Sequence, residues 1–127
     1  MVMTRRPGLF VYGTLCKGQS QHGLVAHLNP RVAKVDGRLY SLSAGYPALS
    51  VTSKGWVWGE LLEAPSDSLL QILDVYEGVH EGLFRRVNVD VFVGLTRHRA
   101  WTYIMDNPQK HKGSWIEGGR WRRVKTR

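Results

Sequence analysis

Residues 84–93 constrain the fold more than any other part of this chain. The alternation of apolar and polar side chains is the cleanest in the chain there, with Val87, Val89, Val91 and Val93 on one face and Arg86, Asn88 and Asp90 on the other. Such alternation is typical of an antiparallel strand that buries one face. Gly94 predicts a hairpin turn, and residues 100–104 predict the partner strand. The pair favours a closed or nearly closed sheet in an α+β fold over a chain of βαβ units.

Three further strands and one convincing helix are expected around this hairpin. The strands lie at residues 8–12, 31–42 and 56–62, and Gly37 indicates a bulge or a close backbone contact in the second. The helix has Ser66 or Asp67 as its N-cap and ends at Gly78, with an apolar stripe of Leu69, Ile72, Leu73 and Tyr76. Residues 44–48 are expected to form a loop, because a proline restricts the residue before it to extended conformations.

Glu77 is the leading candidate for chemistry, since it lies in the last turn of the predicted helix. Repulsion from the partial negative charge at a helix C-terminus disfavours a charged carboxylate by about 0.3–1 kcal/mol. A carboxylate with a raised pKa is a better proton shuttle near neutral pH. Asp74 and Glu81 are weaker candidates, because surface solvation or helix capping explains the first and the second lies in a loop.

A glycine turn, Tyr12-Gly13-Thr14-Leu15, follows the first predicted strand. It can present free backbone N–H groups to an anion, and Thr14 adds a hydroxyl. A turn of donors with one tuned carboxylate is the minimum that acyl transfer requires. Cys16 is expected to be a small buried or half-buried thiol, because the chain has no cysteine-hydrolase signature. The five histidines lack the spacing of metal ligands, so no metal site is expected.

Six short motifs carry a resemblance to a known family. They are Leu9-Phe10-Val11-Tyr12-Gly13-Thr14-Leu15, Tyr46-Pro47-Ala48, Gly59-Glu60-Leu61, Leu73-Asp74-Val75-Tyr76-Glu77-Gly78, Arg86-Val87-Asn88-Val89 and Trp101-Thr102-Tyr103. In this order and spacing the chain resembles the gamma-glutamylcyclotransferase-like superfamily, including its gamma-glutamylamine cyclotransferase branch, over roughly residues 8–105. The resemblance implies a small mixed or antiparallel β-barrel with flanking helices. It also implies a cavity floored by residues 12–15 and one acid/base glutamate, which maps onto Glu77.

The resemblance implies a reaction as well. The α-amine of a gamma-glutamyl amine or amide attacks its own γ-carbonyl and releases 5-oxoproline and a free amine. Because the attack is intramolecular, the enzyme need only hold the folded-back conformer, and one carboxylate can take and return the proton. Backbone N–H groups of Tyr12, Gly13, Thr14 and Leu15 would hold the substrate's carboxylate or the oxyanion. This chemistry requires no metal and no cofactor.

Three aromatic residues, Tyr46, Phe84 and Tyr103, are expected to shape the pocket, although half-buried core positions would also suit the two tyrosines. Phe84 departs from the family pattern, because much of the family has a tyrosine there. The aromatic wall remains and a hydrogen bond is lost, which leaves the amine half of the substrate open. Gly113-Ser114-Trp115 is a candidate for the glycine-containing segment that lies near the active site in that family.

One domain is expected for residues 1–127, with an N-terminal arm at 1–7, a catalytic barrel at 8–106 and a basic tail at 107–127. Residues 110–127 hold seven Lys or Arg and one Glu, so most of the formal net charge of +8 lies there. Basic residues between tryptophans are also typical of nucleic-acid contacts. The alternative function is therefore a non-catalytic small-ligand or nucleic-acid-binding module that uses this tail. A related acid/base reaction on a gamma-glutamyl-protected metabolite is a third hypothesis.

The single cysteine excludes an intramolecular disulfide and indicates a reducing compartment. No signal-peptide core and no membrane-spanning apolar run is visible, so a cytoplasmic protein is expected. The expected partner is a small gamma-glutamyl molecule, and the oligomeric state stays open.

Overall fold

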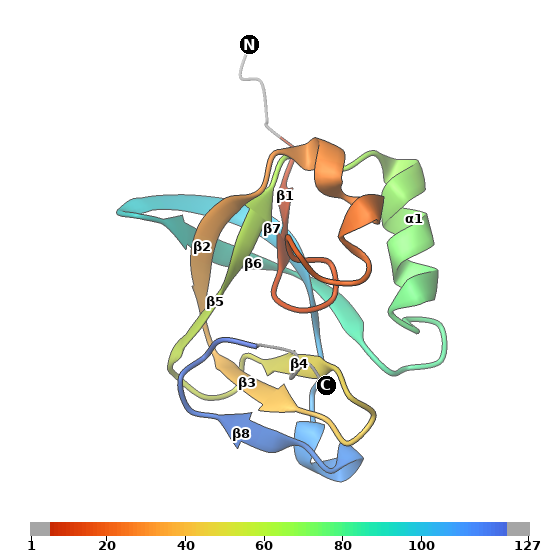
Figure 1. Cartoon of the computed structure of the whole chain (residues 1–127), viewed down its shortest axis with the longest axis vertical. Coiled ribbons are helices and arrows are strands. Elements are labelled where there is room, and N and C mark those ends of the chain that lie inside the picture. Colours follow the sequence, from red (N-terminus) through yellow and green to blue (C-terminus); the bar gives the residue numbers. More distant parts are fainter. Residues whose placement is uncertain (1–5, 122–127) are drawn as a thin grey trace.

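The centre of the molecule is a closed barrel of five strands (Figure 1). The computed structural model describes residues 6–121. The barrel strands, in spatial order, are β1 (Gly8–Val11), β5 (Trp56–Leu62), β2 (Arg31–Asp36), β6 (Arg85–Val93) and β7 (Thr96–Ile104). Neighbours are antiparallel except β1 and β7, which pair in parallel and close the barrel. The mixed barrel expected from the sequence, with the long β6–β7 hairpin within it, is confirmed.

Three short strands extend the sheet beyond the barrel. β4 (Pro47–Ser50) runs parallel to β7 and antiparallel to β3 (Arg38–Ser41), which also pairs with β8 (Ser114–Ile116). The single strand expected at 31–42 is therefore two strands. They separate at Gly37, where a Cβ would lie 2.6 Å from the Ser50 carbonyl oxygen. The loop expected at 44–48 is wrong at its end, because Pro47 and Ala48 begin β4, and proline is tolerated as the first residue of a strand.

Both predicted ends of the helix are confirmed in α1 (Asp67–Tyr76). Ser66 is the N-cap, and its Oγ accepts a hydrogen bond from the Leu69 N–H at 3.1 Å. At the other end Gly78 has a left-handed φ of 67°, its N–H donates to the Val75 carbonyl, and the Val79 N–H donates to the Asp74 carbonyl. This pair of hydrogen bonds is a Schellman motif, which ends the helix and reverses the chain.

The predicted apolar stripe of α1 is partly wrong. Leu70 and Leu73 are buried, whereas Ile72 and Tyr76 are 56% and 44% exposed. The buried face of α1 is the one that packs against the barrel, and it is not the face on which the sequence places the most apolar residues. Since residues four apart lie on one face of a helix, Glu77 continues the face of Leu73 toward the barrel.

Two apolar clusters hold the fold together. One fills the barrel and consists of Phe10, Ala33, Val35, Leu39, Leu49, Val57, Leu61, Val91, Ala100 and Ile104. The other includes Leu9, Val11, Leu62, Leu73, Phe84 and Tyr103, and it packs α1 and the loop after β1 against the barrel wall. Figure 1 shows α1 and this loop on the same side of the barrel, opposite the projecting tip of the β6–β7 hairpin. The second cluster therefore lies beside the place where β1 ends.

The C-terminal segment has more structure than an extended tail. It contains η3 (Pro108–His111) and β8, and the Gly119 carbonyl accepts a hydrogen bond from the Trp58 N–H at 2.8 Å. The 3-10 helices η1 (His22–Leu24) and η2 (Ala26–Leu28) lie in the loop after β1.

The domain division and the nucleic-acid alternative stay predictions, since the basic residues 122–127 and the arm residues 1–5 lie outside the described part. Within residues 6–121, no helix is long and apolar enough to cross a membrane.

Candidate active site

A cavity of about 240 Å³ lies where β1 ends, next to the last turn of α1. All eight residues singled out in the sequence line it: Tyr12, Gly13, Thr14, Leu15, Tyr46, Glu77, Phe84 and Tyr103. Five further lining residues were not singled out: Phe10, Val11, Pro47, Tyr76 and Leu83. Four of these stand inside the motifs quoted above, and Leu83 precedes Phe84. Adjacency to a motif was thus the signal that could have found them.

Glu77 is the C-cap residue of α1, and its N–H donates to the Leu73 carbonyl at 2.8 Å. Its half-buried side chain lines the cavity. Burial raises the pKa of Glu77 from its usual 4.5 to about 7. The sequence predicted the direction of this shift but attributed it to the helix end, and loss of solvent is the cause instead. A carboxylate with this pKa exchanges protons readily at neutral pH.

The turn after β1 lines the same cavity and contains candidate hydrogen-bond donors. Among residues 6–121 no acceptor pairs with the backbone N–H of Gly13, Thr14 or Leu15. A Cβ on Gly13 would lie 2.8 Å from Cγ of Pro47, so glycine is what lets the turn approach the start of β4. The Thr14 hydroxyl is hydrogen-bonded to the Tyr76 hydroxyl at 2.8 Å, which ties the turn to the end of α1. We call residues 12–15 the donor turn.

The hydroxyls of Tyr12 and Tyr103 are committed within the protein. The Tyr12 hydroxyl donates to the Tyr103 carbonyl at 2.7 Å and accepts from the Leu49 N–H at 3.2 Å. The Tyr103 hydroxyl donates to Asp74 Oδ1 at 2.7 Å. Burial, above all, raises the pKa of each tyrosine, so both stay neutral. They therefore offer ring surface to the cavity, while their polar atoms brace its walls.

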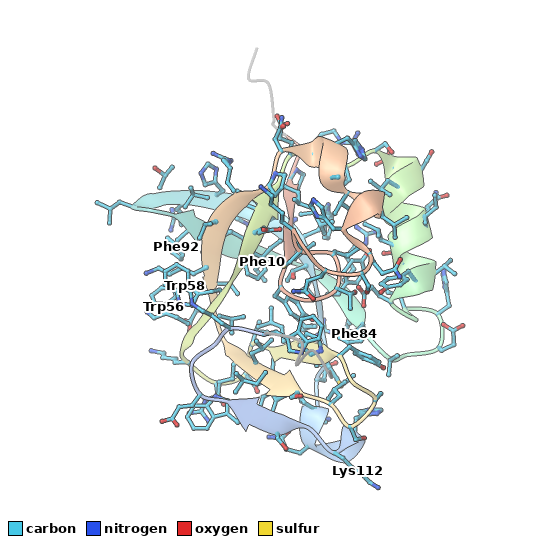
Figure 2. All side chains as sticks on the ribbon, in the orientation of Figure 1. Phe10, Trp56, Trp58, Phe84, Phe92 and Lys112 are labelled. Carbon is cyan, nitrogen blue, oxygen red and sulfur yellow. The ribbon has the colours of Figure 1, made fainter. Side chains whose placement is uncertain are left out.

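Tyr46 and Phe84 form an aromatic wall, with ring centroids 6.2 Å apart and planes tilted by 44°. Figure 2 shows Phe84 in the middle of the molecule, between β4 and the end of α1. The residue is 5% exposed. Of the lining residues within 6–121, Glu77 alone carries a carboxyl or basic group. Within this described part of the chain, a charged substrate group in this cavity would therefore meet Glu77, the backbone donors and hydroxyls such as that of Thr14.

Cysteine and histidine side chains within residues 6–121 do not form a second reactive site. Burial, with a smaller contribution from Glu60, raises the pKa of the Cys16 thiol to about 12, which leaves little thiolate at neutral pH. Nδ1 of His22 is hydrogen-bonded to the Leu15 carbonyl at 3.0 Å. Among residues 6–121, no group of three or more His, Cys, Asp or Glu side chains is arranged to hold a metal ion.

Two expectations about neighbouring segments need correction. Asp74 is neither a solvated nor a capping residue, because its carboxylate binds Arg86 and Tyr103. Gly113-Ser114-Trp115 does not line the cavity, since this segment enters β8 on the far side of β3. From the C-terminal segment, Trp121 lies near the donor turn, and its ring is 4.0 Å from a Cβ placed on Gly13.

Known proteins resemble this chain over most of its length. The family model for gamma-glutamyl cyclotransferase, AIG2-like, matches residues 9–123. The gamma-L-glutamyl-butirosin B gamma-glutamyl cyclotransferase of Niallia circulans is 35% identical over 104 residues, which cover 77% of this chain and 66% of that protein.

Two solved structures share the fold. YkqA from Bacillus subtilis has a TM-score of 0.70 at 27% identity, over 91% of this chain and 39% of that one. An AIG2-like protein of Mus musculus has a TM-score of 0.71 at 19% identity, over 98% of this chain and 100% of that one. The chain thus spans 66% of the curated relative and a smaller part of the Bacillus protein.

Proposed function

Because the chain belongs to the gamma-glutamyl cyclotransferase, AIG2-like family, we propose that it is an enzyme that releases 5-oxoproline and a free amine from a gamma-glutamyl amine or amide. One observation carries this proposal: Glu77 lines the same cavity as Gly13, Thr14 and Leu15, whose backbone N–H groups have no acceptor among residues 6–121. The name of the Niallia circulans relative, which acts on gamma-glutamyl butirosin B, agrees with a gamma-glutamyl substrate.

The reaction follows from these groups. The substrate folds back so that its α-amine faces its γ-carbonyl carbon, and ionised Glu77 takes a proton from the amine as the new C–N bond forms. The carbonyl oxygen becomes an oxyanion, which accepts hydrogen bonds from the backbone N–H groups of Gly13, Thr14 or Leu15. Protonated Glu77 then gives its proton to the departing nitrogen. The old C–N bond breaks, the carbonyl forms again, and the ring product is 5-oxoproline.

The proposal is tested with the purified full chain and a panel of gamma-glutamyl compounds that differ in the amine half. A neutral small amide, a gamma-glutamyl amino acid, a gamma-glutamyl lysine side chain and a gamma-glutamyl aminoglycoside cover neutral, anionic and cationic leaving groups. Mass spectrometry measures 5-oxoproline and the free amine, which the reaction should release in equal amounts. We expect release from at least one compound, and absence of 5-oxoproline from every compound would refute the proposed function.

The pH dependence of activity is a further prediction. The raised pKa of Glu77 means that the carboxylate forms only as the pH rises through about 7. Since the reaction begins with the ionised form, kcat/KM should rise with pH through a midpoint near 7 and fall under acidic conditions. Initial rates at limiting and at saturating substrate concentrations, measured at a series of pH values below and above 7, give this midpoint. A midpoint near the usual 4.5 would contradict a buried general base.

A further inference from the structure

The carboxylate of Asp74 joins α1 to the long hairpin. Asp74 Oδ1 accepts from Nε of Arg86 at 2.8 Å, and Oδ2 accepts from Nη2 at 3.2 Å, a two-point ion pair between α1 and β6. Oδ1 also accepts from the Tyr103 hydroxyl of β7 at 2.7 Å. Such paired, charge-assisted hydrogen bonds fix orientation as well as distance. Asp74 thus attaches the last turns of α1 to both strands of the hairpin.

The Asp74–Arg86 ion pair differs in burial from the other ion pairs among residues 6–121. Its side chains are 16% and 25% exposed. In the pairs Arg6–Asp67, Arg85–Asp106 and Arg99–Asp90, every side chain is at least 45% exposed. Exposed pairs contribute little, whereas loss of one partner from a buried pair leaves an uncompensated charge. Asp74 and Arg86 therefore depend on each other in a way that the surface pairs do not.

Packing holds Arg86 in place. Its guanidinium carbon lies 4.5 Å from the ring centroid of Trp101 on β7, a cation–π contact. Tyr103, which stands opposite Arg86 in the hairpin register, shares its acceptor Asp74. The guanidinium is thus held by a ring and by a carboxylate at once.

Further hydrogen bonds connect Tyr103 and the end of α1 to the donor turn. The Tyr103 carbonyl accepts from the Tyr12 hydroxyl at 2.7 Å, and Tyr12 precedes Gly13. A second link runs from Thr14 to Tyr76, the residue before Glu77. The end of α1 and the donor turn are therefore connected along two routes, and the route through Tyr103 begins at Asp74.

We propose that Asp74 and Arg86 are positioning residues, which hold the last turn of α1 against the hairpin so that Glu77 faces the donor turn, and which cancel each other's charge beside it. This inference rests on the proposed function. Residues three apart on a helix have Cβ atoms about 5–6 Å apart, so an unpaired Asp74 carboxylate would act on Glu77 directly. Burial is the cause that raises the pKa of Glu77, as expected if Arg86 offsets the charge of Asp74.

Within the part of the chain that the structure describes, several elements bring other ionisable groups near Glu77. They are Tyr76 on α1, His80 and Glu81 in the loop after it, Tyr12 and Cys16 after β1, Tyr46 before β4, and Tyr103 on β7. Burial raises the pKa of Tyr12, Cys16 and Tyr103, so these three stay neutral near pH 7, and His80 and Glu81 are exposed. Among residues 6–121, the Asp74–Arg86 ion pair is therefore the least exposed charged pair near Glu77 whose balance a substitution can alter.

Two single substitutions with opposite charge effects test the proposal. In Arg86→Gln the unmatched Asp74 should raise the titration midpoint of Glu77, and in Asp74→Asn the unmatched Arg86 should lower it, each by about one pH unit. A ¹³C carboxyl NMR titration of the full chain without substrate measures this midpoint, with Glu77→Gln to assign the signal. We also expect kcat/KM to fall about tenfold to hundredfold in both variants, because small displacements of a base are costly.

Arg86→Lys separates position from charge. Lysine keeps the positive charge but cannot form the two-point pair, so the midpoint should stay near that of the wild type while kcat/KM falls about tenfold. The controls are Arg99→Gln and Asp90→Asn, which open an exposed pair on the same hairpin and should change neither reading.

Midpoints that do not move, or that move in the same direction in Arg86→Gln and Asp74→Asn, would overturn the inference, as would unchanged turnover in Arg86→Lys. If either single variant does not fold, Tyr103→Phe with the NMR titration replaces it, because loss of the hydroxyl donor to Asp74 should raise the midpoint without removing a charge. The titration needs no turnover. Absence of 5-oxoproline release from the wild type would therefore refute the proposed function and leave the titration to decide the positioning role.

Discussion

Replacement of Glu77 by glutamine should lower 5-oxoproline release by about 10²–10⁴-fold, the usual contribution of a general acid–base group, while the barrel stays folded. Glutamine has nearly the shape of glutamate, so the cavity and the donor turn keep their geometry. It cannot take a proton from the α-amine or return one to the leaving nitrogen. The measurement is kcat/KM for the best compound of the gamma-glutamyl panel, together with circular dichroism of both proteins.

The same variant has a stability signature that distinguishes a buried base from a surface residue. Because the pKa of Glu77 is raised from 4.5 to about 7 in the folded state, the folded protein holds this proton more tightly than the unfolded chain. Wild-type stability therefore falls as the pH rises from 4.5 to 7, and the penalty is complete above 7. Glutamine carries no such penalty, so Glu77→Gln should gain about 1–3 kcal/mol over the wild type above neutrality and nothing below pH 4.5.

Glu81→Gln is the matched control, since it changes the same functional group on an exposed loop four residues away. It should leave both turnover and the pH dependence of unfolding unchanged. Retained 5-oxoproline release in Glu77→Gln would exclude this residue as the base. A loss of activity of similar size in Glu81→Gln would indicate that Glu81 in the loop takes part in the reaction.

Local patterns were sufficient for much of the fold. The alternation at Val87–Val93 predicted the hairpin strand because one face of that strand packs on a core, and Ser66 and Gly78 predicted the helix ends because caps are local chemistry. The break at Gly37 and the strand that begins at Pro47 depend on the approach of β3 to β4, which no window of sequence contains. The buried face of α1 was misassigned for the same reason.

The candidate site follows the same division. The eight predicted site residues line one cavity, because they stand at or near the ends of strands and of the helix that the barrel brings together. The pairing of Asp74 with Arg86 joins residues 12 positions apart across two elements, and periodicity is silent about it. The cause of the raised pKa of Glu77 was missed as well, since burial is a property of the assembled walls rather than of the helix end.

Gly59→Ala should destabilise the protein by about 3–5 kcal/mol, a large part of the stability of a small domain. Gly59 lies in β5 between Val57 and Leu61, whose side chains point into the barrel. A Cβ there would lie 2.1 Å from the Val11 carbonyl oxygen and 2.8 Å from Cζ of Phe10, so strand β1 or the Phe10 ring must move. Urea unfolding followed by tryptophan fluorescence measures the loss.

The displacement would also reach the donor turn, because Phe10 and Val11 line the cavity and lead directly into Tyr12 and Gly13. We therefore expect kcat/KM of Gly59→Ala, measured per folded molecule, to be lower than that of the wild type. Gly23→Ala is the control, since no atom lies within 4 Å of a Cβ at that exposed position. It should be neutral or slightly stabilising. If Gly59→Ala unfolded at the same urea concentration as the wild type, β1 would be able to move away from β5 without loss of stability. The donor turn would then not be held rigidly by the packing of β1 on β5.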